Sequence, residues 1–380
     1  MAVGALLGAL VAPHAPWLVD YVARPAGALF MRLLLVLVMP LAVAALVLGM
    51  AELKTGALGG VAGRALGLTV VLTSIAVGVG VLLVTVVRPG VGIDRSGLPA
   101  GNAVAPLDAS PVDTFVAMVP DNVVTAAAKG DLLGVLVVAV LVGLALRATP
   151  GDAAARFTEV VQGFFDVLVV GVQMVMKLAP VGVAGLTCVL VARTGLEGLA
   201  PLGWFVGVVL SSILFQAVVV YGAALRVLAR RSPVAFYRAI QPALAVAFST
   251  ASSAATLPTT LRVAEVDLGL RPDLARFILT VGASANQNGT ALFEGVAVLF
   301  LAQLYGVDLS IGQAAFVVVV AIAAGVGTAG VPGASLPVIA ALASSLGIPP
   351  ESVGVLVGFD RVLDMCRTTL NVAGDLVIAA

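Results

Sequence analysis

Long apolar segments, separated by short stretches of polar residues, glycine and proline, make up most of this chain. Most of them exceed the roughly 20 apolar residues that a helix needs to cross a bilayer. The pattern predicts an all-α membrane protein with eight transmembrane helices and two re-entrant helical hairpins. The predicted helices cover residues 1–12 (part of a span), 23–51, 57–88, 113–148 (broken near 129–131), 157–193, 199–230, 272–304 and 351–380, and the hairpins cover 234–267 and 310–346.

Two segments in the C-terminal half are weak copies of each other. Residues 250–258 (TASSAATLP) are followed by 286–290 (NQNGT), and residues 328–337 (TAGVPGASLP) are followed by 371–375 (NVAGD). Small residues and prolines interrupt a membrane helix and free backbone groups, which is tolerated where the backbone lines a cavity. Interruptions at corresponding positions of two repeats are typical of the substrate site of a secondary transporter.

The composition is that of a protein in lipid rather than in water. The chain is 61% hydrophobic and 11% charged, and its mean hydropathy is +1.16, whereas soluble proteins are about 25% charged. A formal net charge of zero gives no indication of a nucleic-acid partner. The two cysteines lack the spacing of a metal site or a disulfide framework. Abundant alanine, valine, glycine and arginine with little lysine indicate a GC-rich, bacterial coding sequence.

The distribution of arginine predicts the orientation in the membrane. Arginines are densest at 226–238 and 262–276, on both sides of the first hairpin tip, and the positive-inside rule places this side in the cytoplasm. The first hairpin then opens from the cytoplasm and the second from outside, so the two repeats are inverted. Residues 1–12 lack the basic start of a signal peptide, and we expect them to be the end of a first helix. We expect a multi-pass protein of the plasma membrane, in a bacterium the inner membrane.

The last predicted helix carries charge on one face. Asp364, Arg367, Asn371 and Asp375 are spaced by three, four and four residues, so at about 100° per residue they share a face. A charge at the centre of a membrane helix costs about 2.5–3.5 kcal/mol, so this face must meet protein, a cavity or a ligand. An ion pair between Asp364 and Arg367 alone is the simpler explanation, but it leaves the other two residues unexplained.

These side chains fit an acidic amino acid and a cation. The fork of Arg367 suits a carboxylate, and Asp364 suits an ammonium group. Asp375 with Asn371, Asn286 and nearby carbonyl oxygens would enclose a small hard cation. Glu294, one turn after Thr290, is either a pore-lining side chain or a buried proton carrier. His14 lies near a turn rich in proline, and we expect no metal role for it.

At these residues the chain resembles the glutamate transporter homologues of the dicarboxylate/amino acid:cation symporter family. The motifs are the first tip (Ser252 and Ser253), the NQNGT segment 286–290 in place of NMDGT, the second tip at 327–333, and residues 363–375 of the last helix. The similarity runs from about residue 24 to the end.

The resemblance implies a homotrimer with an elevator mechanism. A static scaffold would hold residues 1–56 (helices 1 and 2) and 89–198 (a loop at 89–112, then helices 4 and 5). A moving transport domain would hold 57–88 (helix 3) and 199–380 (helix 6, both hairpins, helices 7 and 8). By motif position, the implied substrate residues are Ser252, Ser253, Thr290, Val331, Gly333, Asp364, Arg367, Thr368 and Asn371. One sodium site would use Gly282, Asn286, Asn371 and Asp375, and a second would use Ser284, Val326 and Thr328.

Several positions depart from the family pattern. A third sodium site would use Thr73, Ser74 and the motif aspartate, but that aspartate is Asn288 here and the accompanying tyrosine is Val70. Without the negative charge we expect sodium to bind there poorly. The arginine that relatives place in the first tip or in the last helix is absent, since these positions hold Ala251 and Met365. Coupling to a proton, or to fewer sodium ions, follows as the expectation.

The sequence thus predicts an elevator-type symporter of L-glutamate or L-aspartate that needs no cofactor beyond the coupling ion, Na⁺ or H⁺. A dicarboxylate or neutral amino acid symporter is the alternative within the family, and an anion channel is the alternative outside it. An intramembrane enzyme is disfavoured, because the sequence contains no His-rich metal motif and no base placed beside a nucleophile.

Overall fold

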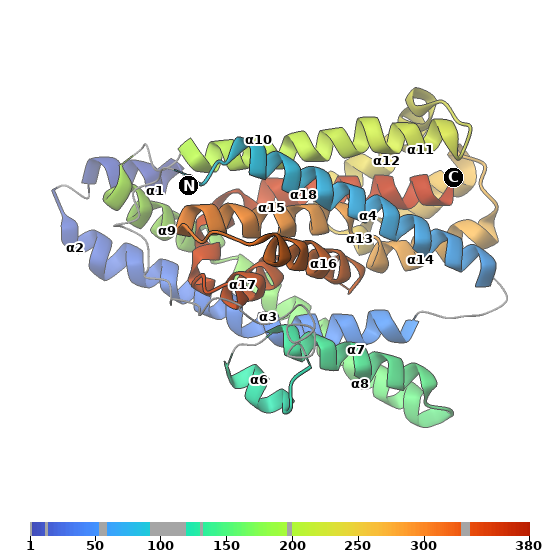
Figure 1. Cartoon of the computed structure of the whole chain (residues 1–380), viewed down its shortest axis with the longest axis horizontal. Helices are drawn as coiled ribbons and strands as arrows, with labels where there is room; N and C mark the ends of the chain where they lie inside the picture. Colours follow the sequence, from blue (N-terminus) through green and yellow to red (C-terminus); the bar gives the residue numbers. More distant parts are fainter. Residues whose placement is uncertain are drawn as a thin grey trace.

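Helices account for all regular structure in the described part of the chain. The computed structural model describes residues 2–11, 14–52, 59–91, 119–129, 132–195, 200–327 and 335–380. These ranges contain no strand, in agreement with the predicted all-α class. The helices run mainly along the long axis of an elongated molecule (Figure 1).

The first half contains eight α-helices and two π-helical turns in its described residues. Helix α9 begins with Pro180 in its first turn, where a missing N–H costs no hydrogen bond. The single span predicted at 157–193 is therefore wrong, because the chain turns at Lys177 and Leu178 between two helices. The elements are α1 (Ala2–Leu6), a π-helical turn (Leu7–Val11), α2 (Pro16–Leu18), a second π-helical turn (Val19–Ala23), α3 (Arg24–Glu52), α4 (Gly59–Val87), α6 (Val123–Lys129), α7 (Leu132–Ala148), α8 (Asp152–Met176) and α9 (Ala179–Thr194).

In the second half, pairs of consecutive helices occupy the segments predicted as hairpins, α12 and α13 in the first and α16 and α17 in the second. In the first, α12 and α13 pack against each other and meet at Ala251, which has a left-handed backbone (φ 52°). The tip of the second lies outside the described residues, between α16 and α17. The elements are α10 (Ala200–Phe215), a π-helical turn (Gln216–Val220), α11 (Tyr221–Val227), α12 (Pro233–Thr250), α13 (Ser253–Arg262), a π-helical turn (Val263–Asp267), α14 (Pro272–Ala285), α15 (Asn288–Tyr305), α16 (Ile311–Gly327), α17 (Ser335–Ser345), a 3₁₀ turn (Pro350–Val353) and α18 (Gly354–Ala379).

The helix predicted at 272–304 is interrupted, which corrects the expectation of one continuous span. Asn286 and Gln287 leave helical geometry, with ψ angles of 73° and 56°. The backbone N–H of Gln287 donates to the carbonyl oxygen of Gly325 on α16 (3.3 Å) rather than to its own helix. A neighbouring helix thus fixes the break, and no proline marks it in the sequence.

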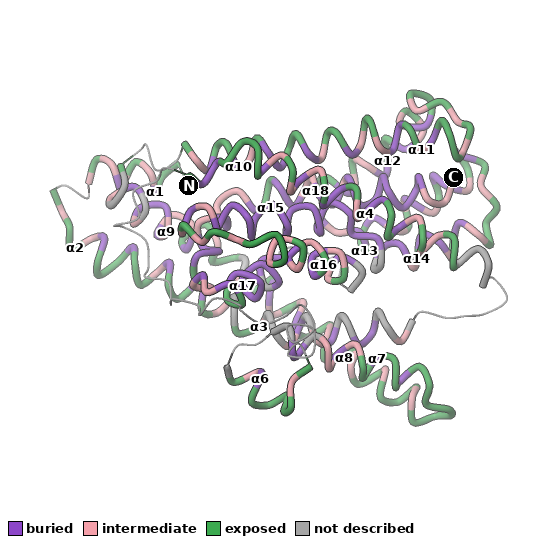
Figure 2. Tube along the Cα trace, viewed as in Figure 1, coloured by how far each residue is buried: buried purple, intermediate pink, exposed green. Residues whose placement is uncertain are grey.

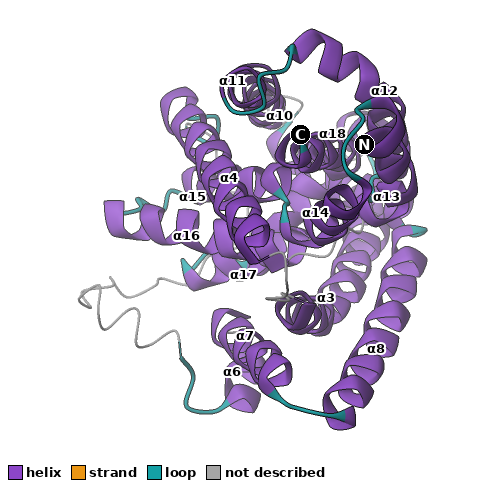
Figure 3. Ribbon diagram, turned by 90° about the vertical axis from the view of Figure 1, so that its right-hand side faces the viewer, coloured by secondary structure: helices purple, strands orange, loops and turns teal. Residues whose placement is uncertain are grey.

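Helix α15 forms the centre of the core. It is apolar on nearly all sides and packs against α4, α10, α16, α17 and α18, and its residues are almost all buried (Figure 2). Helix α18 lies beside it and contacts α12, α13 and α14 as well. Seen end-on, α7 and α8 lie apart from the group that surrounds α18 (Figure 3). Helix α3 packs against α7, α8 and α9.

Three described helices are long and apolar enough to cross a membrane, namely Gly63–Val87, Asp152–Val175 and Ala200–Val227. Shorter apolar helices include Val137–Ala148 and Ala179–Val189 within predicted spans and Ile311–Gly325 within the second predicted hairpin. Large apolar side chains on α8 and α10 point outward, including Phe157, Phe164 and Trp204. Such surfaces are stable in contact with lipid and unfavourable in contact with water.

Candidate functional site

The charged face predicted on α18 is buried inside the protein. Asp364, Arg367, Asn371 and Asp375 are each less than 10% exposed, and Arg367 is fully buried. Asp360 joins them one turn before Asp364 and is 3% exposed. The sequence contains a signal for this fifth residue, because a spacing of seven residues places Asp360 on the same face as Arg367.

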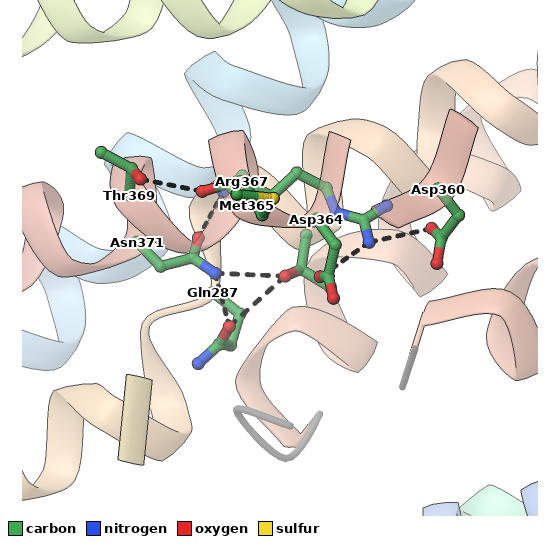
Figure 4. Close-up of polar contacts among 9 residues, drawn as sticks. Gln287, Asp360, Asp364, Met365, Arg367, Thr369 and Asn371 are labelled. Atoms are coloured by element: carbon green, nitrogen blue, oxygen red, sulfur yellow. Dashed lines mark hydrogen bonds and ion pairs between the residues drawn. The ribbon is translucent and has the colours of Figure 1, made fainter. Parts of the chain in front are cut away.

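Arg367 is shared between two carboxylates (Figure 4). Its Nη2 donates to Asp364 Oδ1 at 2.8 Å and to Asp360 Oδ1 at 3.0 Å. The guanidinium lies 3.9 Å above the centre of the Phe293 ring, a favourable cation–π geometry. Its Nε and Nη1 are buried and have no hydrogen-bond partner in the described parts of the protein. The expected ion pair with Asp364 therefore forms, yet two N–H-bearing nitrogens remain available.

The break between α14 and α15 is bonded to α18 through Asn371. The Asn371 side chain accepts from the backbone N–H of Gly289 (2.7 Å) and donates to Gln287 Oε1 (2.5 Å) and Thr290 Oγ1 (3.2 Å). A Cβ at Gly289 would lie 2.8 Å from the carbonyl oxygen of Arg367, so only glycine permits this approach. Gln287 was not predicted as a site residue, and Figure 4 shows it facing Asn371.

Asp375 is buried beside the side-chain amide of Asn286 and the backbone of α14 at Gly282. Asn286 Nδ2 donates to Asp375 Oδ1 at 2.7 Å, while Asn286 Oδ1 is buried and lacks a partner among the described residues. A Cβ at Gly282 would lie 2.6 Å from Asp375 Oδ1, so α14 approaches the carboxylate closely. No described lysine or arginine pairs with Asp375. A buried carboxylate without a cationic partner fits a small cation or a proton.

Asn288, at the position where a degraded third sodium site was predicted, makes hydrogen bonds to neutral groups. Asn288 Oδ1 accepts from the Thr73 hydroxyl, and Asn288 Nδ2 donates to the Tyr221 hydroxyl at 2.8 Å. Ser74 is not part of this group, because its hydroxyl donates to Val70 O in its own helix (2.7 Å). Tyr221 was not predicted, and its separation of 67 residues from Asn288 explains why.

Glu294 is enclosed in the core. It is fully buried, and neither carboxylate oxygen has a hydrogen-bond partner within the described ranges. Burial without a hydrogen-bond partner is costly for a charged carboxylate.

The first hairpin tip brings a second serine inward. Ser252 caps α13 by accepting from the Ala255 N–H (3.2 Å), whereas Ser253 Oγ is buried without a partner in the described structure. Thr368 is also buried. Predicted residues Thr328, Val331 and Gly333 lie outside the described residues, as do the side chains of Ser284 and Val326.

An all-helical, apolar protein that buries charges between a hairpin and a broken helix belongs to the class of membrane transport proteins. The chain is a member of the sodium:dicarboxylate symporter family, whose model matches residues 1–380. It is 36% identical to the proton/glutamate-aspartate symporter of Escherichia coli (strain K12), over 100% of this chain and 90% of that protein.

Two further relatives come from other lineages. The proton/sodium-glutamate symport protein of Geobacillus stearothermophilus is 33% identical, over 94% of this chain and 86% of that protein. Excitatory amino acid transporter 2 of Homo sapiens is 30% identical, over 98% of this chain and 76% of that protein. Family membership of the whole chain confirms the resemblance inferred from the motifs.

Proposed function

We propose that this protein is a secondary active symporter of acidic amino acids, L-glutamate or L-aspartate, in a bacterial inner membrane. The observation that carries the proposal is Arg367, a fully buried arginine that keeps Nε and Nη1 unpaired among the described residues. A buried N–H group without a partner is costly, and a carboxylate ligand would remove that cost. The names of the bacterial relatives support the same substrates.

Arg367 would hold the side-chain carboxylate of the substrate, and Asp364 would hold its ammonium group. When Asp364 turns to the ammonium group, Asp360 at 3.0 Å still neutralises Arg367. The pair of aspartates therefore keeps the arginine compensated with and without substrate. The α-carboxylate end of the substrate would be held by Asn371 and Thr290. The two hairpin tips and one further residue of α18 would complete the substrate site, with Ser252, Ser253, Val331, Gly333 and Thr368.

Coupling would use a proton or a reduced number of sodium ions. Gly282, Asn286, Asn371 and Asp375 would form one cation site, supported by the unpartnered Asn286 Oδ1 beside the uncompensated Asp375. Ser284, Val326 and Thr328 would contribute to a second. We expect no sodium at the neutral Thr73–Asn288 contact, and Glu294 would carry a proton.

Movement would follow the elevator scheme within a homotrimer. The packing of α3 against α7, α8 and α9, and of α4 against α10, α15 and α16, supports a division between scaffold and transport domain. Exposed apolar side chains on α8 would face lipid or a neighbouring protomer.

The test is uptake of labelled aspartate into proteoliposomes under separate gradients of H⁺ and Na⁺. We expect uptake against the substrate gradient that is driven by the proton gradient or by fewer sodium ions than three. Competition by glutamate, but not by neutral amino acids or plain dicarboxylates, is expected. Substrate-independent current without accumulation would instead identify a channel, and an absence of competition by acidic amino acids would refute the proposed substrates.

A further inference from the structure

A π-helical turn separates α10 from α11 inside an otherwise continuous helical segment (Figure 1). It covers Gln216–Val220, and the N–H of Tyr221 donates to the carbonyl oxygen of Gln216, the i to i+5 bond of a π-helix. In an α-helix, residues five apart point about 140° away from each other, because each residue turns by about 100°. The wider turn instead places Gln216 and Tyr221 on one face.

That face is connected to one turn of α4 in two ways, once directly and once through Asn288. Gln216 Nε2 donates to Leu72 O at 3.0 Å. Tyr221 accepts from Asn288, which in turn accepts from Thr73, the residue next to Leu72. The side chains that make these bonds are all buried, namely Gln216, Tyr221, Asn288 and Thr73. The π-helical turn thus holds α4 directly and also through the first residue of α15.

Tyr221 also lies against the backbone of α18. A Cβ at Gly374 would lie 2.5 Å from the Tyr221 hydroxyl and 3.1 Å from Nδ2 of both Asn286 and Asn288. The hydroxyl is 3.4 Å from Leu370 O, to which it donates. It therefore sits where the residues of the candidate cation site and the broken helix converge.

The whole group is uncharged. Threonine, asparagine, tyrosine and glutamine bring no carboxylate, and both ends of the Asn288 amide already have partners. A small hard cation needs several free oxygen ligands, preferably charged ones. One acceptor of this group, Gln216 Oε1, is buried and has no hydrogen-bond partner among the described residues.

We propose that the π-helical turn and Tyr221 form a neutral hydrogen-bonded clamp that positions Asn288, and with it the break at Asn286 and Gln287, without a cation at this point. Tyr221 is a positioning residue, because it acts through Asn288. The inference rests on the proposed function in one respect, namely that the break carries the substrate and cation residues. Side chains would thus hold the break between α14 and α15 in place, as a bound ion would otherwise do.

The first test compares Tyr221→Phe with Tyr305→Phe in the full-length protein in nanodiscs. Tyr305 is a matched control, because its buried hydroxyl has no partner within the described structure. Hydrogen exchange of residues 286–291 is measured without substrate and without sodium, and aspartate affinity is measured by calorimetry. We expect faster exchange and affinity about 2-fold to 10-fold weaker in Tyr221→Phe, the effect of one hydrogen bond, and neither change in Tyr305→Phe. Equal exchange in the two variants would overturn the proposal.

The second test asks whether a cation binds at the clamp. In an Asp375→Asn background, which removes the neighbouring carboxylate, exchange around Thr73 should not respond to added sodium. Introducing Asn288→Asp should create a sodium response there, because a buried carboxylate requires compensation. A sodium response at Thr73 before that substitution would refute the clamp. Since exchange needs no substrate, failure to bind acidic amino acids would refute the proposed function while leaving this readout intact.

Discussion

Replacing Arg367 by lysine separates the role of its charge from the role of its shape. The guanidinium uses one nitrogen, Nη2, for both Asp360 and Asp364 and leaves two nitrogens for a ligand. Lysine keeps the positive charge but replaces the planar guanidinium fork with one nitrogen, so it cannot bind a carboxylate through two nitrogens at once. Arg367→Lys should therefore fold with its buried carboxylates compensated, yet bind an acidic substrate poorly.

The size of the effect follows from the bonds that are lost. A hydrogen bond to a charged group contributes about 1.5–3 kcal/mol, and each 1.4 kcal/mol is about tenfold in affinity. Loss of one bond to the substrate carboxylate thus predicts aspartate binding weaker by about 10-fold to 100-fold. Removing the charge as well, in Arg367→Met, would leave two buried aspartates without a cation and should cost about 3–5 kcal/mol of stability.

Calorimetry with aspartate and thermal unfolding of the same preparations measure both quantities. Arg361→Lys is the matched control, because Arg361 lies on the same helix but is exposed. We expect it to behave as the wild type in both assays. Aspartate affinity in Arg367→Lys within about threefold of the wild type would refute the assignment of Arg367 as the carboxylate ligand.

Three further predictions concern other groups. Gly282→Ala places a methyl group 2.6 Å from Asp375 Oδ1. Because such strain costs about 1–3 kcal/mol, cation-dependent binding of substrate should weaken by about 5-fold to 150-fold in titrations. Glu294→Gln should abolish the pH dependence of uptake in proteoliposomes while substrate still binds, because a proton carrier is replaced by a permanently neutral group. Arg276 lowers the pKa of Glu265 below its ordinary 4.5, so Glu265→Gln should lower the melting temperature slightly at neutral pH, with the difference shrinking as the pH falls below about 4.

Each of these has a control and an outcome that contradicts it. Gly78→Ala adds a methyl group with no described atom within 4 Å and should leave binding unchanged; equal effects at both glycines would exclude a specific clash. Glu159→Gln, on the exposed surface of α8, controls both glutamate substitutions. Uptake by Glu294→Gln that still follows pH would rule out Glu294 as the carrier. A stability difference for Glu265→Gln that grows in acid would contradict the sign of the pKa shift.

The sequence predicted helices wherever the apolar pattern was long and uninterrupted. Helices α3 and α4 occupy the segments expected at 23–51 and 57–88, because continuous apolar composition leaves no other satisfied backbone in lipid. The turn before α9 was missed, although Pro180 was a visible signal for it. The break at Asn286 and Gln287 could not be seen, because Gly325 and Asn371, far away in the sequence, fix it.

The same distinction holds for the candidate site. Asp364, Arg367, Asn371 and Asp375 could be grouped from spacing alone, since helical periodicity is a local property. Tyr221 could not, because its partner Asn288 lies on another helix and no local pattern connects them. Residues that act across helices require the packing itself to be known.

The neutral contact between Asn288 and Tyr221 also has a genetic consequence. Asparagine and aspartate codons differ at their first base only, so one transition would exchange the amide at position 288 for a carboxylate flanked by two hydroxyl groups. If the clamp acts as we propose, a lineage could gain or lose one coupled ion through a single mutation, without rebuilding the surrounding helices.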